Sequence, residues 1–417
     1  MKMKKNNLVV KNTIWIISQN VICSLCSFFL VYFGARRLGK ENWGIYNYAS
    51  SILSIASTAC LFGMNSILVE MFSRDKEQQN AVLGTALVIR RTLAIFAMIC
   101  VFAVLYFSLG TDGTTVIALF FSVSLLFQGY LIYNEWFIAN SCSRFYSISV
   151  IFANVISVLW KLFFLFKMNS LQYFCAGVLV ENAIILFCTH HFIKRQLNVI
   201  HPFSRNKLSE IIRKSKYFAI SDLAIIIYTE IDKIIIKQLL SNGEVGVYSA
   251  AVSIANLWLF VPMALYYSTR PGILEKWDVN KEKAGSELRR LSYQLLGICV
   301  GFILIIFIFK KWIVSFLYGD QYLDCINALM ILSFSMTFSI CGTLGTVWIL
   351  GENLGKYSTY RTVLGLFLNI VLDILFIRKW GMIGAAIGTF ISYFFSGVLS
   401  LAFWKETRGF YKIFKTR

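Results

Sequence analysis

Long apolar segments recur along almost the whole 417-residue chain and leave only short polar connections between them. A helix needs about 20 residues to cross roughly 30 Å of hydrocarbon, and only helices or closed barrels satisfy their backbone groups inside lipid. The segments are continuous apolar runs and do not show the alternating pattern of a lipid-facing strand. The sequence therefore predicts an all-α polytopic membrane protein.

Composition supports this prediction. Hydrophobic residues make up 58% of the chain and charged residues 15%, which is more apolar surface than one soluble core buries. Twelve transmembrane helices are expected, with ends placed to within about 2–4 residues. They lie near 13–34, 45–67, 88–108, 115–138, 146–166, 171–192, 217–240, 246–268, 292–309, 325–349, 358–377 and 382–403.

Lysine and arginine are distributed unequally between the two sets of connections. If the N-terminus is inside, the inner connections and termini hold 29 of these residues and the outer connections hold 8. This excess predicts that both termini are cytoplasmic. It also accounts for most of the net charge of +19, so the charge gives no separate support for a nucleic-acid partner.

A phrase near residue 40 returns near residue 240. A shift of 202 residues gives six identities in 17 positions, namely Leu38/Leu240, Gly44/Gly246, Tyr46/Tyr248, Ala49/Ala251, Ser51/Ser253 and Ile52/Ile254. Six expected helices separate the copies, so both copies enter the membrane in the same direction. The repeat predicts two parallel six-helix bundles, 1–193 and 217–417, joined by a basic cytoplasmic linker, 194–216.

Three phrases together resemble a known family. They are GARRLGKENWGIYNYA at the end of the first expected helix, DKIIIKQLLSNGEVGVYSAA, which begins in the last part of the seventh, and RKWGMIGAAIGTFIS near the C-terminus. In a twelve-helix chain they resemble the Wzx-like polysaccharide flippases of the multidrug/oligosaccharidyl-lipid/polysaccharide (MOP) exporter superfamily. The resemblance covers nearly the whole chain.

The resemblance implies a V-shaped, MATE-like transporter whose two bundles rock about a central cavity. Its cargo would be an undecaprenyl-pyrophosphate-linked oligosaccharide, moved from the cytoplasmic to the periplasmic leaflet of a bacterial inner membrane. The product would serve O-antigen, capsule or exopolysaccharide assembly. Membrane lipids, together with the polymerase and chain-length regulator of the same pathway, are the partners that this resemblance implies.

Charged residues inside the expected helices are costly in lipid and usually face a bundle interior or an aqueous cavity. The helix expected at 217–240 carries five of them. Asp222 and Lys233 share one face of it, and Lys233 lies one turn from both Glu230 and Lys237. That face is a candidate cavity lining. Two simpler interpretations stay open, an ion pair of Lys233 with Glu230 and a Lys237 side chain that extends to the interface.

A pyrophosphate needs cationic hydrogen-bond donors along its path. Lys161, in the helix at 146–166, is the leading candidate, with a structural pair to a carboxylate such as Asp373 as the alternative. Adjacent arginines at two helix ends are further candidates, with interfacial anchoring and lipid headgroup binding as their alternatives. The complete set of candidate substrate-binding residues is Lys161, Lys233, Lys237, Arg36, Arg37, Arg90 and Arg91.

Energy coupling is expected to come from an ion gradient, because the chain contains no GxxxxGK[ST] phosphate loop. A buried carboxyl that binds and releases a proton or a sodium ion would provide it. The candidates are Asp222, Glu230, Asp232, Glu181 and Asp373. We expect no catalytic residues, no cofactor and no metal site, and the ten cysteines are interpreted as packing residues.

Two other functions stay open at this point. One is a cation-coupled multidrug exporter of the same fold, in which unpaired acids and few cations are expected. The other is a membrane enzyme, either a glycan polymerase or a glycosyltransferase, for which a long external loop or a sizeable catalytic domain is expected. The mixture of lysines and acids and the short connections favour the flippase.

The predicted orientation can be tested by labelling in intact cells. A membrane-impermeant thiol reagent should react with a cysteine placed at Asp112 and should not react with one placed at Lys281, because the charge count puts these positions on opposite sides. The reverse pattern of labelling would overturn the orientation and with it the direction of transport.

Overall fold

The computed structural model describes residues 2–74, 76–110, 114–195 and 202–414, and all regular structure in these ranges is helical. Asp112 and part of the predicted linker, 196–201, lie outside the described residues. The chain divides into two compact units, unit 1 (Met1–Ile226) and unit 2 (Ile227–Arg417). Helix α8 (Arg205–Leu239) belongs to both, since the division falls inside it.

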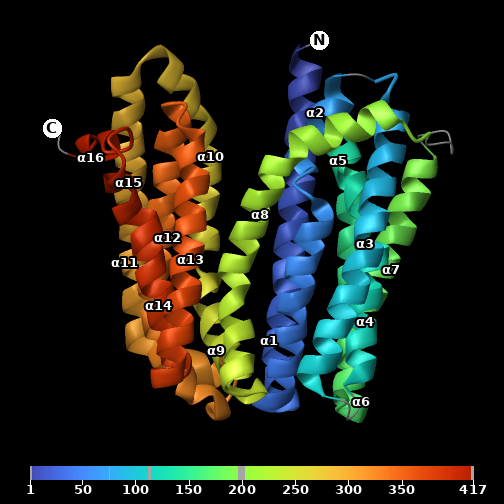
Figure 1. Ribbon diagram of the computed structural model, residues 1–417, viewed down its shortest axis with the longest axis vertical. Coiled ribbons are helices and arrows are strands. Elements are labelled where there is room, and N and C mark those ends of the chain that lie inside the picture. The colour runs from blue at the N-terminus through green and yellow to red at the C-terminus, as the bar shows by residue number, and fades with distance from the viewer. Residues whose placement is uncertain (1, 75, 111–113, 196–201, 415–417) are drawn as a thin grey trace. The chain divides into compact units, whose positions relative to one another are not determined.

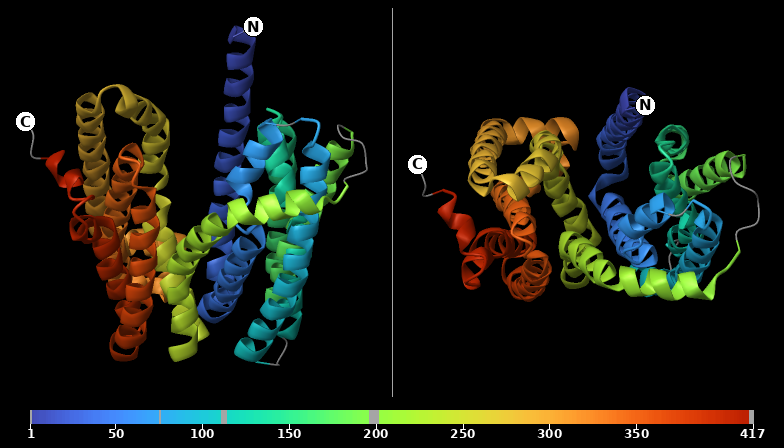
Figure 2. Two further views of the ribbon diagram at one scale, coloured as in Figure 1. Left: turned by 45° about the horizontal axis from the view of Figure 1, so that its top comes forward. Right: turned by 90° about the horizontal axis from the view of Figure 1, so that it is seen from above.

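Unit 1 contains the first seven α-helices, one 3-10 turn and the first part of α8. In Figures 1 and 2 its long helices run side by side, and α6 packs on both α1 and α7. The elements are α1 (Lys2–Leu61), α2 (Asn65–Arg74), α3 (Gln79–Leu109), α4 (Thr115–Phe127), η1 (Gln128–Tyr130), α5 (Leu131–Ala139), α6 (Ser143–Met168) and α7 (Leu171–Lys194).

Helix α1 is interrupted where the first two expected helices should be joined. Gly39 has φ 75° and ψ 170°, a conformation that breaks the helical hydrogen-bond ladder and that glycine adopts without steric strain. The expected helices 13–34 and 45–67 are therefore two parts of one element. The following segment is held tightly, because Trp43 lies against Gly34, where an added Cβ would be 3.0 Å from the indole ring.

The first half of α8 packs on unit 1. Ile211 is fully buried in the same hydrophobic core as Met64, Leu68 and Phe72 of the α1–α2 region. The backbone N–H of Ser204, just before α8, donates to Thr85 Oγ1 of α3 at 3.0 Å. The second part of the predicted linker is thus a helix with one buried side, which is typical of an amphipathic helix.

Unit 2 contains the remaining part of α8 and the C-terminal helices. In Figure 1, α12, α13 and α14 lie side by side, and α14 packs on both of the others. The elements are α9 (Asn242–Leu257), α10 (Phe260–Val279), α11 (Lys281–Leu317), η2 (Asp320–Cys325), α12 (Ile326–Gly351), α13 (Gly355–Trp380), α14 (Met382–Phe394), the π-helix η3 (Phe395–Leu399), α15 (Ser400–Phe403) and α16 (Gly409–Lys412).

The helix expected at 246–268 is bent. Helices α9 and α10 meet at 44° across Trp258 and Leu259. Pro262 follows within the first turn of α10, and it has no N–H to donate to the carbonyl of Trp258. Within the described residues, nine helices are long and apolar enough to cross a membrane, or ten if this bent pair forms one span. Charged side chains interrupt the apolar sequence of α8, which is not one of the nine.

Gly63 provides a test of this packing. It has φ 62°, and a Cβ added there would lie 2.3 Å from the backbone nitrogen of Ala219 in α8. Gly63→Ala should destabilise the protein by more than the about 1–2 kcal/mol that a left-handed conformation costs. Gly129→Ala is the control, since an added Cβ there meets no atom within 4 Å. Equal thermal unfolding midpoints for both purified variants would contradict the packing of α8 on unit 1.

Candidate functional site

Lys161 of α6 lies in the interior of unit 1, with 3% of its surface exposed. Its Nζ is 3.9 Å from Glu181 Oε2 of α7, and Asn154 donates to the other carboxylate oxygen at 3.1 Å. The ammonium also lies 5.8 Å from the ring centre of Tyr46. The carboxylate that this lysine meets is therefore Glu181, in its own unit, and this partly exposed carboxylate balances the charge of the buried lysine.

The close approach of α6 and α7 at this pair depends on a glycine. A Cβ at Gly177 would lie 2.5 Å from Lys161 Cγ, so the lysine stem crosses α7 where α7 has no side chain. Ser157 donates to the carbonyl of the same glycine at 2.8 Å. The small residues at this point let α6 and α7 approach closely. Their close approach places the lysine beside Glu181.

Arg90 of α3 is also buried, with 2% exposed. Its Nη2 donates to Asn65 Oδ1 at 3.0 Å, while Nε and Nη1 make no hydrogen bond among the described residues. Its positive charge interacts with Glu135 of α5, which is 6% exposed. This arrangement makes Arg90 an interior charge and not a surface contact for lipid headgroups.

The other predicted cations are accessible. Arg36, Arg37 and Arg91 are exposed, and Lys237 is half-buried. The Arg36 guanidinium lies 4.5 Å from the ring centre of Tyr32, and the Arg37 guanidinium lies 4.5 Å from that of Phe166. Stacking of this kind on aromatic rings is the geometry expected of an interfacial anchor.

Unit 2 holds an acidic cluster in its interior, formed by Asp232 of α8 with Asn369 and Asp373 of α13, Thr389 of α14 and Tyr248 of α9. Asp232 is 6% exposed and Asp373 is fully buried. The hydroxyls of Tyr248 and Thr389 both donate to Asp232 Oδ2, Thr389 at 2.6 Å. These hydrogen bonds connect α8, α9 and α14 at one point.

Other polar atoms of this cluster find no N–H or hydroxyl partner among the described residues. They are Asp232 Oδ1, both carboxyl oxygens of Asp373 and both amide atoms of Asn369, and all of them are buried. The two carboxyls interact electrostatically with each other. Within the described parts of the chain, neither carboxyl has a lysine or arginine partner in an ion pair.

Local sequence explains how the cluster forms. Asn369 and Asp373 are four residues apart on α13 and therefore share one face of the helix. Gly388 of α14 lies against that face, where an added Cβ would be 2.3 Å from Asp373 Oδ1. The small residues of α14 let the two helices approach until the carboxyl is enclosed.

Two buried carboxylates side by side are not stable as bare anions. Desolvation costs several kcal/mol per ion, and mutual repulsion adds to it. The pair must therefore hold a proton or a bound cation. The atoms that could bind a cation here are carboxylate, amide and hydroxyl oxygens, and hard cations prefer oxygen ligands. Among the described residues no group of three or more His, Cys, Asp or Glu side chains could hold a metal.

The other predicted acids are arranged differently. Glu230 forms an ion pair with Lys233 at 2.7 Å, as the alternative interpretation of this helix face anticipated. Asp222 is half-buried and lies in the part of α8 that belongs to unit 1. Of the five candidate coupling acids, the structure brings together Asp232 and Asp373, while Glu181 and Glu230 each face a lysine.

Sequence reasoning missed four members of these sites. Asn369, Thr389 and Tyr248 are uncharged, so a search for charges inside helices passes over them. Glu135 is charged, but it lies near an end of its expected helix. The spacing of Asn369 and Asp373, one helical turn apart, is the signal that was present in the sequence.

Solved structures with this fold are membrane transporters. The lipid II flippase MurJ, in an inward closed conformation, matches with a TM-score of 0.74 at 15% identity, over 97% of this chain and 90% of that one. An inward-facing multidrug resistance MATE family transporter of the MOP superfamily matches with a TM-score of 0.73 at 16% identity, over 96% and 99%. The chain therefore shares the fold of these two proteins.

The chain belongs to the polysaccharide biosynthesis protein family, whose model matches residues 9–264, and the MatE model matches 218–375. The capsular polysaccharide biosynthesis protein CapF of Staphylococcus aureus is 25% identical over 95% of this chain and 100% of its own length. The probable low-salt glycan biosynthesis flippase Agl15 of Haloferax volcanii is 22% identical over 94% and 82%. The family consists of transporters and flippases, not enzymes.

The acidic cluster predicts a cation-dependent stability. The thermal unfolding midpoint of the purified protein should rise when sodium replaces choline at neutral pH, or when the pH is lowered, because either change relieves the repulsion between Asp232 and Asp373. Asp373→Asn should remove most of this response. Asp222→Asn, on the same helix as Asp232 but in unit 1, is the control and should keep it. An unchanged response in Asp373→Asn would contradict the assignment.

Proposed function

We propose that this protein is a flippase that moves a lipid-linked oligosaccharide across the membrane by alternating access, driven by a cation that binds and leaves the acidic cluster. Membership of the polysaccharide biosynthesis family and the names of its relatives support the cargo class. The observation that carries the coupling mechanism is the pair of buried carboxyls, Asp232 and Asp373, with unfilled acceptor atoms and no counter-charge.

The finer parts of the proposal rest on the sequence pattern for the topology and on the family resemblance for the cargo and partners. We propose twelve crossings in two six-helix bundles, with α1 counted twice on either side of Gly39, α9 and α10 counted as one bent crossing, and α8 as the charged crossing. The excess of inner positive charge supports cytoplasmic termini, and the resemblance to polysaccharide flippases supports a bacterial inner membrane. The cargo is an undecaprenyl-pyrophosphate-linked repeat unit that moves outward for a polymerase and a chain-length regulator to use.

Two lysines of α8 are proposed as contacts for the cargo phosphates. Lys233 and Lys237 are partly exposed, and they lie on the same helix as Asp232, so cation binding and cargo binding involve one element. Lys161 is buried beside the partly exposed Glu181, which fits a charge that stabilises unit 1. The exposed arginines Arg36 and Arg37 would hold phosphate at the outer end of α1's first segment.

Surface glycan, measured in cells that lack their own transporter and normalised to membrane protein abundance, separates these roles. Lys237→Gln should reduce display roughly ten- to hundredfold at normal abundance, because a charge-assisted hydrogen bond contributes about 1.5–3 kcal/mol. Lys237→Arg should retain part of the activity. Unchanged display in Lys237→Gln would leave this lysine as an interfacial anchor only.

Lys161 should behave differently. Lys161→Ala leaves Glu181 without its cation, and because Glu181 is partly exposed the cost stays below the about 3–5 kcal/mol of a fully buried pair. Abundance and display should therefore fall together. Neutralising both residues, Lys161→Ala with Glu181→Gln, should restore abundance and display. If the double variant is abundant but exports no glycan, Lys161 contacts the cargo and our assignment of its role is wrong.

A further inference from the structure

An apolar groove of about 390 Å³ lies between α3 and the first half of α8, entirely within unit 1. Thr92 is its one polar lining residue. Several of the apolar side chains are accessible, and Phe203 is 53% exposed. The groove is concave, unlike the isolated exposed side chains on other helices, and an exposed apolar surface of this shape marks a binding surface. Its apolar walls include Phe62, Val88, Leu93, Phe203, Leu208 and Ile212.

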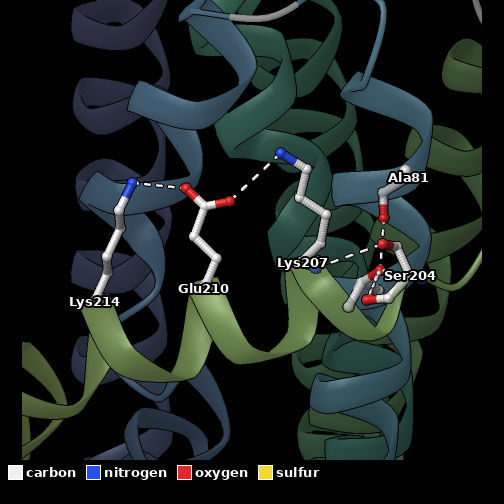
Figure 3. A network of polar contacts seen from close by, with 6 residues as sticks. Ala81, Ser204, Lys207, Glu210 and Lys214 are labelled. Atoms are coloured by element: carbon white, nitrogen blue, oxygen red, sulfur yellow. Dashed lines mark hydrogen bonds and ion pairs between the residues drawn. The ribbon is translucent and has the colours of Figure 1, made fainter.

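Both walls of the groove are fixed. At one end the hydroxyl of Thr85 donates to the carbonyl of Ala81 at 2.7 Å and accepts the backbone N–H of Ser204 at 3.0 Å (Figure 3). At the other end Phe62 has φ 49°, a strained conformation for an aromatic residue, and Gly63 next to it packs on Ala219. The groove is therefore present before any ligand arrives.

The outer edge of the groove is basic. Residues 202–216 contain five lysines and arginines and one acid, Glu210. Figure 3 shows Glu210 between two lysines, 2.8 Å from Lys214 Nζ and 3.4 Å from Lys207 Nζ. Hydrogen bonding from Lys214 lowers the pKa of this carboxyl, which is therefore ionised and cancels one of the positive charges. Arg91, next to Thr92 on α3, is also exposed. A positive edge remains beside an apolar channel.

We propose that this groove binds an anionic phospholipid, with one acyl chain along the groove and the headgroup phosphate on the basic edge at Lys207 and Arg91. Apolar contact along the groove favours the acyl chain, and basic residues at a membrane surface attract anionic headgroups. The lipid would hold the first half of α8 against α3. Walls joined by hydrogen bonds suit a resident lipid better than a cargo that enters and leaves in each transport cycle.

The test uses the purified full-length protein in detergent, with mixed micelles of either phosphatidylglycerol or phosphatidylcholine. Phosphatidylglycerol should raise the thermal unfolding midpoint more than phosphatidylcholine does. Ile212→Trp and Val88→Trp fill the groove from opposite walls, and each should remove more than half of this difference. The control is Ile99→Trp on α3, an exposed apolar position that does not line the groove, and it should behave as wild type.

Two further measurements decide the headgroup and the occupant. Lys207→Gln should weaken the preference for phosphatidylglycerol without changing the response to phosphatidylcholine. Native mass spectrometry should find phosphatidylglycerol retained by the wild type and lost from whichever tryptophan variant folds. Equal stabilisation by the two lipids, or a preference that persists in both tryptophan variants, would overturn the proposal. A selective response to undecaprenyl phosphate, with none to phosphatidylglycerol, would assign the groove to the cargo's tail instead.

Discussion

A carboxylate inside an apolar interior needs an opposite charge, hydrogen-bond donors or a bound ion, and this constraint applies to the polar interior of both units. In unit 1 Glu181 meets it through Lys161. In unit 2 the acidic cluster does not, because Asp232 and Asp373 face each other. The internal repeat relates these two charged centres. Its equivalent tyrosines, Tyr46 and Tyr248, lie one in each centre, beside the lysine and hydrogen-bonded to Asp232 respectively.

In the proposed mechanism the two units therefore have different roles. A centre that carries its own counter-charge is complete in every state of the protein, whereas a pair of carboxyls changes its charge whenever a cation arrives or leaves. Helix α8 carries Asp232 in unit 2 and continues into unit 1, where its first half is packed in the core through Ile211. A change at the acidic cluster therefore acts on an element that is covalently part of both units, as the proposed ion-driven cycle requires.

The sequence contained much of the fold and about half of the site. Apolar runs of about 20 residues predict membrane helices because their length is imposed by the bilayer. The ends were less predictable, since α8 begins at Arg205 through an amphipathic turn that no long apolar run marks. Asp232 and Asp373 could be found from the sequence, because a charged residue inside an apolar segment is visible without knowing how the helices pack. Their proximity, and the roles of Asn369 and Thr389, depend on how α8, α13 and α14 pack, which one sequence does not contain.

Transport in proteoliposomes tests the central claim most directly. The purified protein would be reconstituted with a fluorescent lipid-linked oligosaccharide, and exposure of the glycan in the opposite leaflet would be followed with a sugar-modifying enzyme added outside. The account predicts that an imposed sodium or proton gradient accelerates translocation in the wild type, and that the paired replacement Asp232→Asn with Asp373→Asn leaves a slow rate independent of the gradient. Gradient-driven translocation at the wild-type rate in that double variant would contradict the account.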